Sequence, residues 1–423
     1  MRRFLTTLAA SAVLAGAALA PAAAQELRVV EVLTSPDRTD VMNRIVAEFE
    51  ADNPGVSVEL ISIPWDTAFE RVLNMALSGQ TIDVIEMPER FISSLAANDW
   101  LSDLGPWLDG WDGASELTEA ALDYTRIFDN TAYFLPYGFF VRAMIYNREL
   151  LSEAGFDAPP ETMEEFLTMV EAVSELDGHY GYCLRGAVGG FVGWWLLVSA
   201  YTGADSWFNE DGTTVFTSPE GIDAIQAMLD IYNNGWAPRD GVNWAYNDVV
   251  AGFYSRTCAF LDQDPDALTS IRARMSDDEF GVIPIPLGPK GVMSPPVGMI
   301  GWSVPTTSEN PELAQAFVER LASPEVNLEW ARFMGVVPAV EVPEDDEFFN
   351  APQFAGFVKQ LADDRWQMRP WPAYLPELGE FFDVLSVETS QAALLGQLSA
   401  EELAAEWDAF LTPAKQRWLA EQQ

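Results

Sequence analysis

Three short β-rich runs alternate with two segments of helical periodicity, and this alternation constrains the fold more than any other feature of the chain. The runs cover residues 27–33, 56–63 and 82–87. Between them, apolar residues recur at helical spacing, first at Val41, Ile45, Val46 and Phe49 and then at Phe69, Val72, Leu73 and Leu77. A β-α-β-α-β order implies a parallel sheet with helices on both faces. We therefore predict an α/β fold.

Helix signals continue through the middle of the chain. Thr162 is followed three residues later by Glu165, the pattern of a capping box, and Ser218 precedes Pro219, another strong helix start. Residues 280–285 return to strand character. The chain has 423 residues, 49% of them hydrophobic, which exceeds one comfortable core. Two domains are therefore expected.

The N-terminus has the layout of a secretory signal peptide. Arg2 and Arg3 precede an apolar run over residues 4–20, and small residues follow at 22–24. The alternative is a membrane anchor, but the run is shorter than the roughly 20 residues that a span needs, and it is rich in Ala. We predict a signal peptide over residues 1–24, cleaved before Gln25, and hence export to the periplasm.

The charge of the chain excludes one class of partner. Lys and Arg number 23 against 65 Asp and Glu, a formal net charge of −42, and loss of Arg2 and Arg3 with the leader would make it −44. Such a surface repels phosphate backbones, so nucleic acid is not expected as a partner. Anionic membrane surfaces are disfavoured for the same reason.

Cysteine and histidine are scarce. Cys183 and Cys258 are the two cysteines, and in an exported chain they are expected either to form one disulfide or to remain two buried thiols. His179 is the single histidine, which makes a His-based catalytic triad or a multi-His metal site hard to build. No metal and no cofactor are expected.

Five segments in order resemble the family 1 extracellular solute-binding proteins, the group that contains the maltose-binding protein. They are DVIEM (83–87), LPYGFFVRAMIYNRELLSEAGFDAPPETMEEF (135–166), SRTCAFLDQD (255–264), FGVIPIPLGP (280–289) and GMIGWSVPTTSENPELAQAFVERLASPE (298–325). The likeness extends to α-proteobacterial members assigned to sugars and polyols, which similarly carry cysteines in segments like CLRG (183–186) and RTC (256–258). This resemblance favours the disulfide.

The resemblance implies two lobes, each a mainly parallel sheet flanked by helices and joined to the other by hinge strands. Lobe one would comprise residues 25–134 and 284–322, and lobe two residues 135–283 and 323–423. The chain would cross between them near Leu135-Pro136, near Pro284 and near Ser323-Pro324.

It also implies a function without catalysis. A monomer in the periplasm would capture a sugar, a polyol or a related small solute and deliver it to the membrane permease subunits of an ABC importer. Two other ligand classes stay open, a polyamine and an anionic sugar derivative. The alternative class is a secreted carbohydrate-active enzyme, in which Glu86 with Glu89, or Asp262 with Asp264, would serve as acid and base.

A sugar site combines aromatic rings with hydrogen-bonding carboxylates, amides and guanidinium groups, and candidates of both kinds lie near predicted strand ends. The aromatic candidates are Trp65, Trp371 and Trp302, the last preceded by Gly301. The polar candidates are Asp37, Glu89, Arg185, Asp262, Asp264 and Arg369. Glu86 is expected to be structural. The sequence GMIGWSVP departs from the double glycine usual in the family, which bears on the identity of the ligand.

Overall fold

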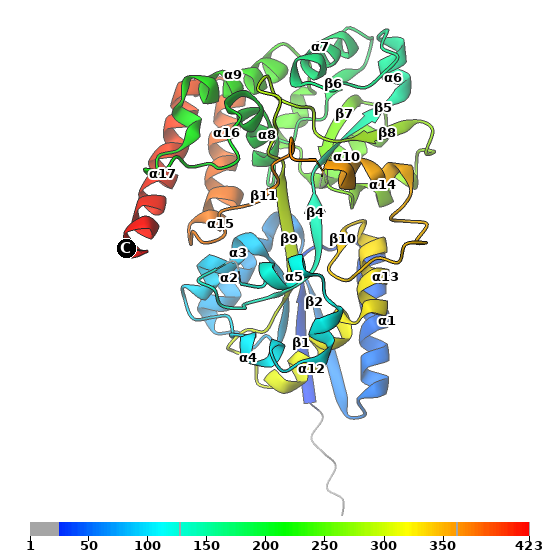
Figure 1. Ribbon diagram of the computed structural model, residues 1–423, viewed down its shortest axis with the longest axis vertical. Coiled ribbons are helices and arrows are strands. Elements are labelled where there is room, and N and C mark those ends of the chain that lie inside the picture. Colours follow the sequence, from blue (N-terminus) through cyan, green and yellow to red (C-terminus); the bar gives the residue numbers. More distant parts are fainter. Residues whose placement is uncertain (1–24, 127, 361–362, 423) are drawn as a thin grey trace, which may run out of the picture.

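The computed structural model describes residues 25–126, 128–360 and 363–422. The expected signal peptide lies outside these residues. Two lobes stand one above the other, each with its own sheet, and strands β4 and β9 run between them (Figure 1). We call them the larger-sheet lobe and the smaller-sheet lobe. None of the helices in the described ranges is both long and apolar enough to cross a membrane.

The larger sheet has the strand order β10-β4-β9-β3-β1-β2, with β11 paired to β9. Its strands are β1 Gln25–Glu31, β2 Val56–Ser62, β3 Val84–Pro88, β4 Leu135–Val141, β9 Pro296–Ser303, β10 Val337–Pro338 and β11 Arg369–Pro370. Strand β1 pairs in parallel with β2 and β3, which confirms the prediction from residues 27–87. The later strands β4 and β9 pair antiparallel with each other, and β9 with β3.

Helix α1 (Pro36–Asp52) shows how the sequence builds this lobe. The Ser35 side chain caps its first turn, and the predicted apolar face is buried at Ile45, Val46 and Phe49. The next predicted helix begins with a short 3-10 turn, Trp65–Thr67, before α2 (Ala68–Ser78) ends at Gly79 with φ +66°. The other helices of the lobe are α3 Glu89–Ala96, α4 Gly105–Leu108, α5 Glu119–Tyr124, α12 Pro311–Ala322 and α13 Pro324–Met334, with a 3-10 turn at Asp112–Glu116.

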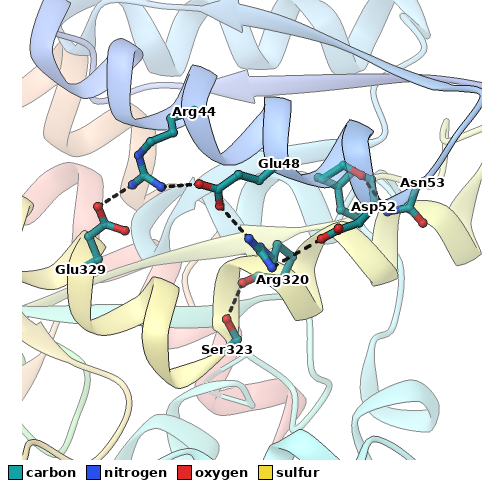
Figure 2. Close-up of polar contacts among 8 residues, drawn as sticks. Arg44, Glu48, Asp52, Asn53, Arg320, Ser323 and Glu329 are labelled. Atoms are coloured by element: carbon teal, nitrogen blue, oxygen red, sulfur yellow. Dashed lines mark hydrogen bonds and ion pairs between the residues drawn. The ribbon is translucent and has the colours of Figure 1, made fainter.

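A chain of ion pairs joins α1 to α12 and α13 on the outside of this lobe (Figure 2). Arg44 pairs with Glu48 (2.8 Å) on α1 and with Glu329 on α13. Arg320 on α12 reaches back to Glu48 at 2.6 Å and Asp52 at 3.8 Å. Because these side chains are largely exposed, each pair contributes little to stability, on the order of 0–1 kcal/mol.

The smaller sheet has the order β6-β7-β5-β8, with strands β5 Ala143–Asn147, β6 Tyr180–Tyr182, β7 Cys258–Gln263 and β8 Phe280–Ile283. Only β6 and β7 pair in parallel, whereas β5 is antiparallel to both β7 and β8. The expectation of a mainly parallel second sheet is therefore wrong. The reason is the crossing, because β5 enters this sheet directly from β4 and inserts between β7 and β8.

The helices of the smaller-sheet lobe are α6 Arg148–Glu153, α7 Met163–Ser174, α8 Phe191–Thr202, α9 Pro219–Asn233, α10 Tyr246–Tyr254, α11 Ala267–Arg272, α14 Pro352–Lys359, α16 Ser386–Leu394 and α17 Ala400–Glu421. Shorter turns lie at Val215–Thr217, Arg239–Asn243, α15 (Leu378–Glu380) and the π turn Phe381–Leu385. Trp194 and Trp195 of α8 are both buried, at 2% and 3% exposed. Edge-to-face contacts join Phe191 to Trp207 and Trp407, so α8 packs in an aromatic core.

The lobe boundaries differ from the expected ones at two places. Strand β4 pairs with β9 along its length, so residues 135–141 belong to the larger sheet and the chain crosses at Arg142 rather than near Leu135. Helix α13 and β10 also stay with the larger sheet, where the Asn327 side chain donates to the Tyr137 carbonyl at 3.0 Å. Both lobe boundaries are set by contacts with segments far away in the sequence.

Cys183 and Cys258 form a disulfide, with their Cα atoms 5.4 Å apart. It joins the loop after β6 to the start of β7 and encloses a sequence separation of 75 residues. Arg185 lies two residues beyond this covalent link, so the bond anchors a segment that reaches the space between the lobes.

Candidate ligand-binding site between the lobes

A cavity of about 380 Å³ lies where the two lobes meet, and we call it the interlobe cavity. This volume is at the lower end of the range of small-molecule sites. The larger-sheet lobe contributes Asp37, Arg38, Trp65, Asp66, Glu89 and Arg90. The smaller-sheet lobe contributes Arg185, Tyr246, Asp264 and Asp266, together with Trp371 and Phe382 from the later chain. Strands β4 and β9 supply Phe140, Gly298, Met299 and Ile300, and Arg142 follows β4.

The structure brings six of the predicted ligand-binding residues to this cavity. They are Asp37, Trp65, Glu89, Arg185, Asp264 and Trp371. Trp65 comes from the 3-10 turn after β2, and Glu89 from the first turn of α3 directly after β3. These positions follow strand ends, which is where an open α/β sheet places ligand-contacting loops.

Gly301 and Trp302 are not among the residues that line the cavity, because both belong to the interior of β9. Trp302 is 1% exposed and packs its ring against Tyr137 at 5.6 Å and Trp330 at 6.4 Å. A Cβ at Gly301 would lie 2.2 Å from the Leu135 carbonyl oxygen, so the glycine permits the close approach of β4. Their roles in the structure are packing and strand pairing.

Asp262 and Arg369 also lie away from the interlobe cavity. The Asp262 carboxylate accepts a hydrogen bond from the Tyr182 hydroxyl and lies 3.6 Å from Arg142 Nε. Arg369 is exposed and pairs with Asp205 at 2.9 Å. Gln263 lines the cavity, and its neighbour Asp262 points to the opposite face of β7 because successive strand residues alternate between faces.

Glu86 is a structural residue, as expected. Its carboxylate is fully buried and accepts from the backbone N–H groups of Val32 (2.8 Å) and Leu33 (3.0 Å). It also accepts from Arg38 Nη2 at 2.8 Å and the Tyr137 hydroxyl at 2.7 Å. This network fixes the end of β1 and orients Arg38 at the cavity wall.

Glu89 is buried at the cavity wall, where a backbone N–H group donates to its carboxylate. Its Oε2 accepts from the Met299 N–H at 2.8 Å, and the residue is 5% exposed. Burial raises the pKa of Glu89 to about 7, against the lowering effect of the Met299 hydrogen bond. A carboxyl group in this state can accept or donate a hydrogen bond near neutral pH.

Asp266, on the opposite wall, is a site residue that the sequence reading missed. Its Oδ1 is buried with no hydrogen-bond partner in the described part of the chain. Burial, followed by repulsion from Asp264, raises the pKa of Asp266 to about 7, and a hydrogen bond with Tyr246 opposes the shift. The alternation of acids at 262, 264 and 266 in LDQDPD was the available signal.

Arg142 and Tyr246 were missed as well. Arg142 is 4% exposed and pairs with Asp264 at 3.2 Å, which orients that carboxylate. It is the single charged residue in the apolar run GFFVRAMIY (138–146), a signal that the sequence did contain. Tyr246 opens α10, and nothing local in its sequence distinguishes it from a packing residue.

Arg90 is the fourth missed residue, and it joins the two lobes at the cavity edge. Its Nε donates to Asp383 Oδ2 at 3.1 Å and its Nη2 to Asp383 Oδ1 at 3.0 Å. The Arg90 guanidinium also lies 4.1 Å from the centroid of the Trp65 ring and 5.9 Å from that of Phe382. Nearby, the Ser93 hydroxyl donates to the Leu375 carbonyl at 2.6 Å.

Two sheet-bearing lobes that meet over a cavity with polar and aromatic walls define the class of two-lobed solute-binding proteins. The chain belongs to the family of bacterial extracellular solute-binding proteins, whose model matches residues 35–328. A protein of Brucella abortus (strain 2308), described as a binding protein, is 24% identical over 385 residues, covering 88% of this chain and 89% of its own. The maltotriose-binding protein of Pyrococcus abyssi is 24% identical over 337 residues, covering 76% and 68%.

Solved structures share the fold over most of both chains. Maltose-bound MalE3 of T. maritima superposes with a TM-score of 0.78 at 21% identity, covering 92% of this chain and 99% of its own. A solute-binding protein of an ABC transporter of Agrobacterium radiobacter K84, in complex with ribitol, has a TM-score of 0.78 at 17% identity, covering 93% and 100%. At these low sequence identities, the similarity to the solved structures establishes the fold alone.

Proposed function

We propose that this protein captures a polyhydroxylated solute, a sugar or a polyol, in the interlobe cavity and delivers it to the permease subunits of an ABC importer. The observation that carries the proposal is the composition of the cavity wall. Aromatic rings at Trp65, Tyr246 and Trp371 alternate there with the polar groups of Glu89 and Asp266. Rings pack against the C–H faces of a sugar, and the polar groups bind its hydroxyls.

The two carboxyl groups of the wall, Glu89 and Asp266, suit the hydroxyl groups of such a solute. A hydroxyl group both donates and accepts, and a carboxyl group with a pKa of about 7 can meet it in either role, as Glu89 and Asp266 do from opposite walls. A polyamine fits less well, because guanidinium groups already lie over two of the rings, Arg90 over Trp65 and Arg185 over Tyr246.

Capture would proceed by rotation of the lobes about the crossing segments. The chain passes between lobes at Arg142, between β8 and β9, and again after α13 and β10. The hydrophobic cluster around the larger sheet continues into Phe253 of α10 and Leu268 of α11, so the lobes are in contact as in a closed form. Ligand that binds the closed form better than an open form would shift the population toward it.

The carbohydrate-active enzyme is the less favoured function. Glu86 is engaged by four hydrogen bonds inside the larger-sheet lobe, and Asp262 is bonded to Tyr182. Neither expected acid pair therefore presents two carboxyl groups to the same cavity, which an acid and base acting on a glycosidic bond require. This geometry supports binding without turnover.

The relatives support the ligand class and the location. Neighbours of the same fold are described with maltose, α-D-tagatose and ribitol, and one relative from Escherichia coli is described as a periplasmic-binding protein of an ABC transporter. By analogy, we propose that this chain works as a monomer in the periplasm after loss of residues 1–24.

Tryptophan fluorescence tests the proposal, because Trp65 and Trp371 line the cavity. Titration with hexoses, pentoses, linear polyols and disaccharides should give a saturable change in emission with at least one of them. The same compound should raise the melting temperature, since a ligand at 100 times its Kd adds about 2.7 kcal/mol to the free energy of unfolding. The proposal fails if no sugar, polyol or sugar derivative changes either signal.

A further inference from the structure

Four arginines lie deep in the wall of the interlobe cavity, and Arg185 differs from the other three in its lack of a carboxylate partner within the described ranges. Arg38, Arg90 and Arg142 each pair with a carboxylate of the protein, namely Glu86 at 2.8 Å, Asp383 at 3.0 Å and Asp264 at 3.2 Å. Within the described ranges, Arg185 forms no ion pair, and its Nε and Nη2 are shielded from solvent without a hydrogen-bond partner.

The backbone around Arg185 holds the guanidinium in one place. Gly189 has φ +85°, and a Cβ there would lie 2.5 Å from Arg185 Cζ, so the guanidinium occupies the space that a side chain at 189 would need. The Tyr246 ring lies 5.9 Å away on another side. The disulfide at Cys183 anchors the same loop. Such support is characteristic of a group positioned for binding.

A guanidinium whose nitrogens are largely shielded from solvent and have no counter-charge is costly, because it loses hydration without gaining an ion pair. Burial, followed by repulsion from Arg142, lowers the pKa of Arg185 to about 10, which still leaves it charged at neutral pH. Asp66 and Asp264 act on it from a distance, but neither is within 4 Å of its nitrogens. In the described part of the chain, the wall therefore offers Arg185 no carboxylate in direct contact.

We infer that the ligand itself carries a negative charge, as a carboxylate, phosphate or sulfonate group that pairs with Arg185. The inference rests on the proposed function and narrows it to acidic sugar derivatives. The oxyanion would take the place that Glu86, Asp383 and Asp264 take for the other three arginines, and the hydroxyls of the same ligand would meet Glu89 and Asp266.

Calorimetry with matched pairs of acid and neutral compounds tests the inference. The pairs are D-galacturonate with D-galactose, D-gluconate with D-glucitol, and glucose 6-phosphate with D-glucose, so that carboxylate and phosphate are distinguished. In at least one pair, the acid should bind at least about ten times more tightly than its neutral counterpart. Its affinity should also fall as salt rises, whereas that of the neutral compound should change little.

Variants assign the preference to Arg185. Arg185→Gln should weaken binding of the preferred acid about 10- to 100-fold and of its neutral partner by no more than a few-fold, with the melting temperature of the unliganded protein kept. Gly189→Ala keeps the charge but adds a Cβ where the guanidinium lies, and should also reduce the preference. Arg239→Gln, which removes the same charge from an exposed position, should leave both affinities unchanged.

The possible outcomes separate this inference from the proposed function. If neutral sugars bind as tightly as their acids, or if Arg185→Gln weakens both members of a pair equally, the inference is wrong and the proposed function stands. If no compound of any pair binds, the result counts against both.

Discussion

Arg90 on α3 holds both carboxylate oxygens of Asp383 across the boundary between the lobes, at 3.1 Å and 3.0 Å. The neighbours of the two residues belong to different hydrophobic clusters, Phe91 to that of the larger-sheet lobe and Phe382 to that of the smaller-sheet lobe. Burial raises the pKa of Asp383, and the Arg90 guanidinium opposes the shift. This bidentate pair is therefore a direct contact between the two lobes.

Asp383→Asn should therefore lower ligand affinity without unfolding either lobe. In an open form both charges would regain water, so removing the pair penalises the closed form alone, and we expect affinity to fall about 10- to 100-fold. Calorimetry measures the affinity, and small-angle scattering should show a larger radius for the variant. Asp363→Asn is the control, because Asp363 pairs with the exposed Arg365. Equal affinity in wild type and Asp383→Asn would contradict the role of the pair.

Two tryptophans should behave in opposite ways when replaced. Trp65→Ala removes a ring from the cavity wall and should weaken binding about ten-fold, with a change of less than about 1 kcal/mol in the free energy of unfolding. Trp302→Ala empties a fully buried site in β9 and should cost about 3–5 kcal/mol.

Urea unfolding and fluorescence titration together separate the two effects. Trp302→Phe serves as a milder variant if Trp302→Ala does not fold. A larger loss of affinity in Trp302→Phe than in Trp65→Ala would show that the assignment of the two rings is reversed.

The buried Glu89 should make stability depend on pH in a definite direction. With the folded pKa raised from 4.5 to about 7, the folded protein keeps a proton that the unfolded chain has released, so the free energy of unfolding falls as pH rises through this window. Glu89→Gln can still accept from Met299 and does not titrate. The stability of wild type relative to this variant should drop by roughly 1–3 kcal/mol between pH 4.5 and 7.5.

Denaturant unfolding at a series of pH values measures this difference, which leaves out the contribution of Asp266 because both proteins retain it. Glu344→Gln, at an exposed position, should run parallel to wild type. Parallel curves for wild type and Glu89→Gln would show that Glu89 is ionised in the folded protein as in the unfolded chain.

The disulfide should stabilise the smaller-sheet lobe. It closes a loop with a sequence separation of 75 residues, and disulfides typically contribute about 2–4 kcal/mol, largely by constraining the unfolded chain. Cys183→Ser with Cys258→Ser should lower the free energy of unfolding by this amount, and addition of a reductant should affect wild type alone. A double variant as stable as wild type would exclude this contribution.

Local patterns predicted the parts of the fold that depend on local sequence. The alternation over residues 27–87 gave the parallel strands β1, β2 and β3, and the pattern at Thr162 gave the capping box of α7. The crossing at Arg142 could not be placed, because β4 belongs to the larger sheet only through its pairing with β9, some 160 residues later.

The site residues divide in the same way, into those placed by local sequence and those placed by distant partners. Trp65 and Glu89 follow strand ends, where position in the sequence indicates exposure to the cavity. Trp302 was misplaced because residue type alone does not tell which face of β9 a side chain occupies. Arg90 and Tyr246 gain their positions from partners in other elements, Asp383 and Asp266, which no local pattern reveals.

Mass spectrometry of the protein purified from its own cells tests whether the interlobe cavity holds a polyhydroxylated solute. Native conditions should show the protein with an added mass, and denaturing conditions should release one compound with the composition of a sugar, a polyol or an acid derived from them. Asp383→Asn should retain less of it. Release of a peptide, a lipid or another compound without hydroxyl groups would contradict the account.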